Sequence, residues 1–507
     1  MSLETSEAEF NALRRVTAFS ARVDEVLEEA LISKASLEDV LAHVLPLLGE
    51  MGASAVAIST FDDSLAMKSF AWPTSSAPEA ILSDPTAEKA HLEVAGQGFG
   101  ELAARFPSEV TNAPAILAAF AEQLDDVLAS RALAREKFQV HQAISDALKE
   151  PVLDDGLSAA IRLLAQKVRF DTLILVYRHE EDSRGVTLGY KIARGGVIVH
   201  DSQGPTDREV DAYVRAHAEA FLKGASEGIA ERFGSPHVQG EALINGVRTE
   251  RLIGRLLVGR AAGRFSTHDR DLLDIFADYV RMRVADFNRE WKRLSTFFRP
   301  DDVRRLLHQP FYGEGLRPRV EEIAILYTDI ASFTRIAEEV LVEPARIGAL
   351  VDVWSQRSVE ILWAQGGVFD KMVGDCVIGL FGPPFFDRPK AEICENALEA
   401  VRRIREYTAT LSSDPRFPEL HGREPLGVAS GLNYCPVAVG LFGPSEDYTA
   451  FGSGMNNAAR LQGAAKRGEI LAMDSFVNVL GRPELFGEER HVAVKNVAKP
   501  LPFRALL

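Results

Sequence analysis

One order of predicted elements occurs twice in the N-terminal part of the chain: a helix, then strands, then a long exit helix. In the first copy, apolar residues recur at helical spacing over 1–50, the strands are Ala55–Phe61 and His91–Val94, and the exit helix is Ala115–Ala147. In the second copy, the elements are a helix at Leu157–Lys167, strands at Phe170–Tyr177 and Arg251–Gly259, and a helix at Phe265–Ala285. The 507 residues are enough for about three domains, so the repeat predicts two small α/β units followed by a further domain.

Charge, cysteine content and hydropathy exclude several classes of protein. The formal net charge is −16, so the chain lacks the broad basic surface that nonspecific nucleic-acid binding needs. The three cysteines show no CxxC spacing, which argues against a disulfide framework or a zinc site. The N-terminus is acidic and no run of 18 apolar residues occurs, so neither a signal peptide nor a membrane span is predicted. We therefore expect a cytoplasmic protein with no nucleic-acid and no membrane partner.

Two segments of the repeated units resemble tandem GAF domains, which are small α/β sensor modules. The resemblance rests on RLIGRLLVGRAAGRFSTHDRDLLDIFADYV at 251–280 and on GQGFGELAARF at 96–106. It implies a helix and first GAF-like domain over 1–130 and a linker helix and second one over 131–290. The Asn-Lys…Phe…Asp-Glu signature of cyclic-nucleotide-binding GAF domains is absent from the sequence, and no cysteine precedes Cys376 to anchor a chromophore. A small-molecule ligand and dimerisation without a ligand both stay open for these units.

A heptad pattern follows the second unit. Its apolar positions are Val280, Val284, Phe287, Trp291, Leu294 and Phe298, with spacings of 4, 3, 4, 3 and 4. This pattern predicts a two-stranded coiled coil in a linker over 280–317, which ends at Pro300 and is followed by a short helix over 301–307. The alternative is a single amphipathic helix that packs on its own domain. As a coiled coil, the linker would pass a signal from the sensor units to the C-terminal domain by changing the angle between two chains.

Two aspartates of the C-terminal part lie where predicted strands end or turn. The apolar run Ile323–Tyr327 predicts a buried strand that ends at Asp329, and a helix begins a few residues later. The segment GGVFDKMVGDCVIGLFG at 366–382 predicts a β-hairpin with Lys371, Gly374 and Asp375 in its turn. A short helix between these strands would let Asp329 and Asp375 converge on a pair of Mg²⁺ ions. For either aspartate alone, a helix cap or a turn residue is the simpler interpretation.

A third segment, DYTAFGSGMNNAARL at 447–461, predicts a strand, a Gly-rich turn and a helix. Asn456 and Arg460 lie at i and i+4 on one face of that helix. Such a pair can bind a sugar oxygen and a phosphate oxygen together, because the guanidinium group of arginine matches phosphate geometry. For this segment taken alone, a surface arginine on an ordinary helix is the simpler interpretation.

Together the three segments resemble the catalytic domain of class III nucleotidyl cyclases. The motifs are Asp-Ile-x-Ser-Phe-Thr at 329–334, GGVFDKxxGD at 366–375 and YTxxGxxxNxAAR at 448–460. The resemblance covers 318–507 and implies a ferredoxin-like α+β catalytic domain. In fold class, the chain is thus predicted to be a multidomain α/β protein with two GAF-like sensors, helical coiled-coil linkers and this C-terminal domain.

The resemblance implies roles for residues of the first two motifs. Asp329 and Asp375 would bind two Mg²⁺ or Mn²⁺ ions per site, with the Ile330 carbonyl as a further ligand. The backbone over 331–334, which includes Ser332, Phe333 and Thr334, would hold the β- and γ-phosphates of the substrate.

Further positions of the family pattern imply contacts to the nucleotide. Lys371 would donate to adenine N1, and Thr449 occupies the second base-selecting position. A threonine hydroxyl can accept from the adenine amine or donate to guanine O6, so Lys371 carries more of the prediction that ATP is the substrate. Asn456 would orient the ribose, and Arg460 would neutralise charge at the α-phosphate. Lys495 would contact the triphosphate.

In this family the metal-binding pair and the base- and ribose-binding residues of one site come from different subunits. All of these residues are present in the chain, so the resemblance implies a homodimer with two complete sites and with contacts through the coiled coil and the catalytic domains. The expected activity is an adenylate cyclase, a phosphorus–oxygen lyase that forms cyclic AMP and pyrophosphate. Cys435 stands where the family usually has glycine, which we interpret as a packing variant.

Other functions stay open or are excluded by missing motifs. A diguanylate cyclase needs GG[DE]EF and a P-loop enzyme needs GxxxxGK[ST], and the sequence contains neither. A guanylate or pyrimidine nucleotide cyclase remains an alternative. A catalytically silent, dimerising sensor protein would predict loss of a metal-binding aspartate, Asn456 or Arg460, and none of these is lost.

Overall fold

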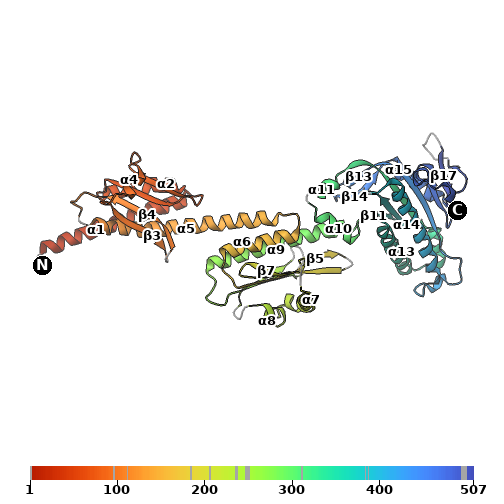
Figure 1. The fold of residues 1–507 in the computed structure, drawn as a ribbon, viewed down its shortest axis with the longest axis horizontal. Helices are drawn as coiled ribbons and strands as arrows, with labels where there is room; N and C mark the ends of the chain where they lie inside the picture. Colours follow the sequence, from red (N-terminus) through yellow and green to blue (C-terminus); the bar gives the residue numbers. More distant parts are fainter. Residues whose placement is uncertain are drawn as a thin grey trace. The chain divides into compact units, whose positions relative to one another are not determined.

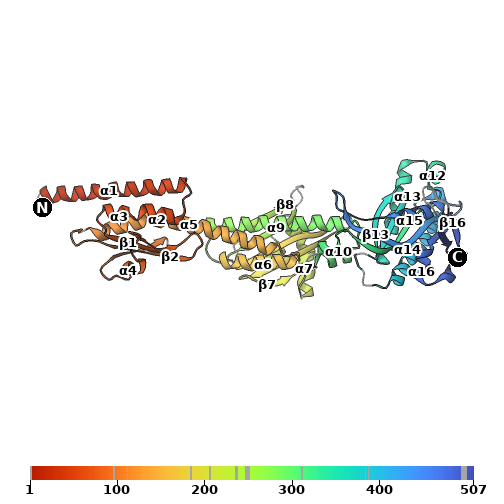
Figure 2. The same ribbon diagram turned by 90° about the horizontal axis from the view of Figure 1, so that it is seen from above.

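The structure is a computed structural model, and it describes residues 3–507 apart from 95–96, 111, 183–184, 205–206, 226, 235–237, 246–251, 310–311, 383, 386–387 and 493–499. Figures 1 and 2 show the helices and strands of the chain in two views. The chain divides into two compact units. One contains Met1–Ala147, Ala160–Arg169 and Gly263–Phe276, and the other contains Leu148–Ala159, Phe170–Ala262 and Ala277–Leu507. Each helix in the described ranges is too short or too polar to cross a membrane.

The first unit is built on an antiparallel sheet with the strand order β2-β1-β4-β3. Its strands are β1 (Ala55–Phe61), β2 (Met67–Trp72), β3 (Glu88–Val94) and β4 (Gln97–Arg105). Its helices are α1 (Leu3–Ile32), α2 (Leu37–Val44), α3 (Leu47–Glu50), α4 (Pro78–Leu82) and α5 (Ala113–Leu148). Apolar residues of α1, α2 and α5 form one core with the sheet, which explains the helical spacing seen in the sequence. The predicted strands match β1 and β3, and the predicted exit helix matches α5.

The second sheet is also antiparallel, with the order β7-β6-β5-β9-β8. Its strands are β5 (Thr172–Asp182), β6 (Gly185–Arg194), β7 (Val197–Asp201), β8 (Val238–Asn245) and β9 (Leu252–Gly259). The helices in this part of the chain are α6 (Leu153–Lys167), α7 (Arg208–Leu222), α8 (Ile229–Phe233) and α9 (Thr267–Leu294). The four predicted elements of this region are therefore helices and strands of the predicted type. The GAF-like identity of both N-terminal regions stays a prediction.

Helix α9 carries the heptad positions from Val280 to Leu294 and ends there, so the last position, Phe298, lies beyond the helix and before the end predicted at Pro300. Pro300 instead begins α10 (Pro300–Leu307), where the N–H that proline lacks would have no helical partner. The last heptad positions are buried within the single chain: Phe287, Trp291, Leu294 and Phe298 are at most 6% exposed. Phe287 packs on His179 of β5, with ring centroids 6.2 Å apart. This burial supports the alternative of a helix packed on its own unit, and the coiled coil stays a prediction.

The C-terminal sheet has eight strands in the order β11-β12-β10-β13-β15-β17-β16, and β14 pairs with β13. The strands are β10 (Arg319–Ile330), β11 (Gly367–Val373), β12 (Cys376–Phe381), β13 (Val428–Phe442), β14 (Asp447–Phe451), β15 (Ile470–Met473), β16 (Arg490–Val492) and β17 (Leu501–Ala505). The helices are α11 (Tyr312–Gly315), α12 (Phe333–Ile336), α13 (Pro344–Ala364), α14 (Lys390–Thr410), α15 (Ser453–Ala464) and α16 (Asp474–Leu480), with a π-helical turn at Ala337–Leu341. The short helix predicted between the two aspartates is present as α12, but the 21-residue α13, which was not predicted, follows it.

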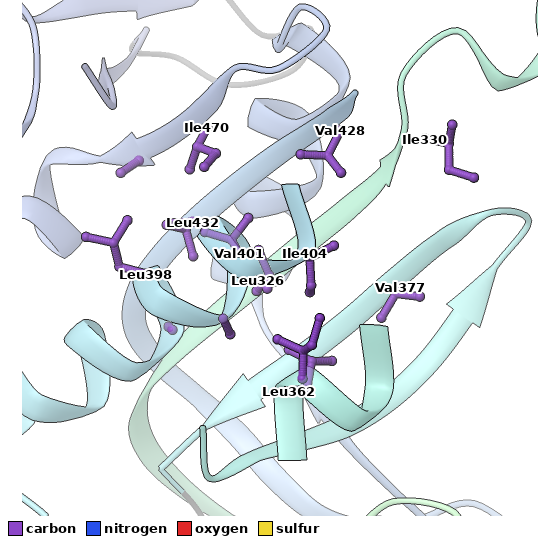
Figure 3. Packing of buried hydrophobic residues seen from close by; sticks show 14 of the residues in the cluster. Leu326, Ile330, Leu362, Val377, Leu398, Val401, Ile404, Val428, Leu432 and Ile470 are labelled. Atoms are coloured by element: carbon purple, nitrogen blue, oxygen red, sulfur yellow. The ribbon is translucent and has the colours of Figure 1, made fainter. Parts of the chain in front are cut away.

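The two faces of this sheet carry different helices. Even-numbered residues of β10 and β13, such as Leu326 and Leu432, pack against α13, α14 and α16 (Figure 3). Figure 3 shows Leu362 of α13 and Val401 of α14 in this core. Leu461 of α15 packs with other strand residues in a separate cluster. Since side chains alternate along a strand, the odd-numbered residues of β10, including Asp329, face the side where α15 lies.

Candidate active site

Asp329 and Asp375 reach the same end of the sheet through the pairing of β10 with β12. Thr328 pairs with Val377, so the residues after Thr328 lie beside the turn that joins β11 to β12. The Ile330 N–H donates to Asp375 Oδ2 at 3.2 Å. The structure thus brings the two predicted metal-binding aspartates together. Lys371, which was predicted in the turn with Asp375, lies within β11 instead.

The two carboxylates form a site of concentrated negative charge. Oδ1 of Asp329 is buried and has no hydrogen-bond partner in the described part of the chain. Burial, and then the charge of Asp375, raise the pKa of Asp329 to about 6, and burial raises the pKa of Asp375 as well. Among the described residues, no group of three or more His, Cys, Asp and Glu side chains could hold a metal. Two carboxylates with an unsatisfied oxygen fit a divalent cation such as Mg²⁺ or Mn²⁺, which prefers oxygen ligands.

Gln462 of α15 also belongs to this site, although it was not predicted. Its Nε2 donates to Asp329 Oδ2 at 2.6 Å. The helix can approach β10 because Gly431 of β13 has no side chain, and a Cβ there would clash with the carbonyl oxygen of Ala458. The sequence signal that could have identified Gln462 is its position two residues after Arg460 in the same motif.

Lys371 and Thr449 meet although they lie on different strands, β11 and β14. Lys371 Nζ donates to Thr449 Oγ1 at 3.0 Å. The Lys371 side chain is 48% exposed, whereas Thr449 is buried. Asp370, which was not predicted as a site residue, lies beside them with a fully buried side chain, and its Oδ1 is 3.7 Å from Lys371 Nζ. The predicted base-selecting pair is therefore assembled within one chain.

Asn456 and Arg460 lie on helix α15, whose first turn is hydrogen-bonded to a residue of β13. The buried Asn433 donates from Nδ2 to the Gly454 carbonyl at 3.0 Å in the first turn of the helix. The Cys435 side chain lies against Gly454, so it fills space beside α15. Asn456 is exposed, and Arg460 Nη1 donates to Asn457 Oδ1 at 3.2 Å.

The predicted phosphate-binding backbone lies between β10 and α12. The Ala331 N–H donates to the Gly427 carbonyl at 2.9 Å, so this N–H is already bonded. Ser332 adopts a left-handed conformation with φ of 60° and turns the chain into α12. Phe333 and Thr334 stand in the first turn of α12, where backbone N–H groups have no partner within the helix. Phosphate binding by Ser332, Phe333 and Thr334 stays a prediction, and Lys495 lies outside the described residues.

Sequence comparisons place the same part of the chain in one family. Residues 317–499 match the adenylate and guanylate cyclase catalytic domain. A photoactivated adenylate cyclase subunit alpha-like protein of Euglena gracilis is 27% identical over 150 residues, which is 28% of this chain and 13% of that protein. The pH-sensitive adenylate cyclase of Mycobacterium tuberculosis is 27% identical over 173 residues, or 34% of this chain and 36% of that protein. The chain thus spans far less than two thirds of the length of either relative.

Solved structures of catalytic domains were also found. The adenylyl cyclase CyaB from P. aeruginosa matches with 26% sequence identity and a TM-score of 0.34, and the match covers 38% of this chain and 96% of that structure. The guanylyl cyclase Cya2 matches with 22% identity and a TM-score of 0.31, over 37% of this chain and 93% of that structure.

Proposed function

Since residues 317–499 are an adenylate and guanylate cyclase catalytic domain, we propose that this protein is an adenylate cyclase that converts ATP to 3′,5′-cyclic AMP and pyrophosphate. The observation that carries the proposal of ATP as substrate is the Lys371–Thr449 pair, in which the Lys371 ammonium is held 3.0 Å from the Thr449 hydroxyl. A lysine only donates hydrogen bonds, so it suits the acceptor N1 of adenine but cannot accept from the N1–H of guanine. A guanylate or pyrimidine nucleotide cyclase is the alternative, because the Thr449 hydroxyl by itself suits either purine.

The mechanism needs charge neutralisation more than a side-chain base. Asp329 and Asp375, with the Ile330 carbonyl, would hold two divalent cations, which when bound make the ribose 3′-hydroxyl more acidic and neutralise the triphosphate. Arg460 would stabilise charge at the α-phosphate, and Asn456 would orient the ribose for in-line attack. The proposed mechanism assigns no side chain as a general base, so positioning and electrostatics would provide most of the rate enhancement.

The geometry of α15 supports a site that is shared between two chains. Gln462 faces Asp329 of its own chain at 2.6 Å. Arg460 precedes it by two residues, which corresponds to about 200° around the helix axis, so Arg460 is directed away from the metal-binding pair of its own chain. A second copy of the chain would bring its own Asp329 and Asp375 to this arginine. We therefore propose a homodimer with two composite sites.

Contacts of the linker support regulation of the catalytic domain by the N-terminal regions. Arg304 of α10 binds both oxygens of Glu180 in β5, at 2.8 and 2.7 Å, and the Glu180 side chain is only 5% exposed. A few residues earlier, the Phe297 carbonyl accepts from the Phe369 N–H at 3.0 Å, two residues before Lys371. The Phe298 ring packs on Tyr448, which precedes Thr449, with centroids 4.9 Å apart. A ligand-dependent displacement of β5 would therefore be transmitted through these contacts to β11 and β14, the two strands that carry the base-selecting pair.

The proposed activity is tested by incubating the purified chain with Mg²⁺ or Mn²⁺ and each of the four nucleoside triphosphates. We expect cyclic AMP, identified by mass, as the main product. Cyclic GMP or a cyclic pyrimidine nucleotide as main product would replace ATP as substrate. If no triphosphate yields a cyclic product with either metal, the proposal of a cyclase is wrong.

A further inference from the structure

Asp370 occupies a bulge in the strand that carries Lys371. In the pairing of β11 with β12, Phe369 lies opposite Gly379 and Lys371 lies opposite Ile378, so Asp370 is an extra residue with no partner of its own. A bulge of this kind directs a side chain away from the face that strict alternation would give it. Here the charged groups of two successive residues, Asp370 and Lys371, lie 3.7 Å apart, and Lys371 reaches Thr449 of β14.

The Asp370 carboxylate is a buried charge without an ordinary partner. Its side chain is fully buried, and neither of its oxygens accepts a hydrogen bond from the residues that the structure describes. The Nζ atom of Lys371 lies 3.7 Å from its Oδ1. Burial raises the pKa of Asp370, while the Thr449 hydroxyl and the Lys371 ammonium oppose that rise. An isolated carboxylate in such a place destabilises the fold, so its position beside the base-selecting pair needs a functional explanation.

A carboxylate beside Thr449 would bias the direction in which the hydroxyl proton points. Thr449 has one hydroxyl proton and two lone pairs. One lone pair accepts from Lys371 at 3.0 Å. If the proton is drawn to Asp370, only a lone pair remains for the nucleotide, and that lone pair accepts from the exocyclic amine of adenine. The O6 atom of guanine would face the same lone pair and be repelled.

We propose that Asp370 is a positioning residue that orients the Thr449 hydroxyl as an acceptor, holds Lys371 beside it, and thereby selects adenine over guanine. This inference rests on the proposed nucleotide cyclase activity. Asp370 itself touches no part of the nucleotide and acts through its two neighbours. The proposed role of Asp370 would explain how Thr449 can favour adenine, although a threonine hydroxyl in isolation suits both purines.

The test compares Asp370→Asn with the unchanged protein in initial-rate measurements with ATP and with GTP. The substitution keeps the shape of the side chain but supplies an amide that can donate to Thr449 and release its proton toward the base. We expect discrimination between ATP and GTP, as the ratio of kcat/KM values, to fall at least ~10-fold, the effect of losing one hydrogen bond to a charged group. The change should lie mostly in KM for ATP, with kcat altered less than about threefold.

Two further variants separate positioning from a merely structural role. Thr449→Val removes the hydroxyl and should lower discrimination by a similar factor, and in that background Asp370→Asn should lower it no further. The matched control is Glu360→Gln, which removes an exposed carboxylate of α13 and should leave discrimination unchanged.

The outcomes distinguish this inference from the proposed function. If the unchanged protein makes cyclic AMP and Asp370→Asn retains full discrimination, the role of Asp370 is wrong while the cyclase activity stands. An equal loss of rate with both nucleotides would show a structural role and would also overturn it. If Asp370→Asn does not fold, a Thr449→Val variant with full discrimination overturns the inference. If the unchanged protein makes no cyclic nucleotide, the proposed function fails and this inference fails with it.

Discussion

The two halves of the candidate site are stabilised in opposite ways. The metal-binding half places Asp329 and Asp375 together at the end of β10, and the charge of each carboxylate opposes the other. In the base-selecting half, the Lys371 ammonium lies 3.0 Å from the Thr449 hydroxyl and 3.7 Å from the buried Asp370 carboxylate, so the cation that these acceptors need is part of the chain. The first half is therefore complete only with an added cation, whereas the second is complete within the chain.

This difference predicts different consequences of substitution. In the metal-binding half, each carboxylate is needed for the reaction itself, because the charge of the triphosphate must be neutralised. In the base-selecting half, a substitution changes which base is preferred more than how fast the chemistry proceeds. The following experiments test this contrast.

The largest effect is expected for Asp375→Ala. Loss of one of two metal-binding carboxylates should lower kcat with ATP by at least ~1,000-fold, which corresponds to several kcal/mol of transition-state stabilisation. Glu360→Ala is a suitable control, because it removes an exposed carboxylate from α13 and should not change the rate. Residual activity within tenfold of the unchanged protein would show that Asp375 is not part of the metal-binding half.

A smaller effect, on selectivity, is expected for Lys371→Glu. The exchange replaces a donor by an acceptor and should reduce the preference for ATP over GTP by roughly 10- to 100-fold, since one strong hydrogen bond is lost and a repulsive contact is introduced. Competition between ATP and GTP in one reaction, with both cyclic products quantified by mass, measures the ratio. An unchanged ratio would remove the basis for assigning ATP as the substrate.

The smallest effect is the pH dependence of metal binding. The pKa of Asp329 without a bound cation is raised to about 6, so protons compete with the metal below that pH. The apparent affinity for Mn²⁺, measured by calorimetric titration without nucleotide, should be nearly constant above pH 7 and fall as the pH decreases through 6, by up to ~10-fold per pH unit. Binding of ATP analogues to the base-selecting half in the absence of metal should not share this profile. A constant Mn²⁺ affinity from pH 5 to 8 would contradict the role of Asp329.

Local patterns in the sequence predicted much of this site, and long-range contacts account for what they missed. The apolar run before Asp329 and the hairpin around Asp375 are local signals, and both elements are present as β10 and as β11 with β12. The contact of Gln462 with Asp329 depends on the close approach of α15 to Gly431, which is distant in sequence. The burial of Asp370 depends on a bulge, and spacing along a strand does not reveal a bulge. The heptad pattern over 280–298 indicated that these apolar side chains are buried, and they are. The pattern alone could not distinguish packing within one chain from a coiled coil between two chains.

The most direct test of the central claim, that each site combines halves from two chains, is complementation between two inactive variants. Asp375→Ala lacks the metal-binding half, and Arg460→Ala lacks the half that α15 supplies. Co-expressed with different affinity tags in equal amounts, they should form mixed dimers in which one of two sites is intact, and about a quarter of the activity of the unchanged protein should return. The mixture would stay as inactive as either variant alone if one chain formed the whole site.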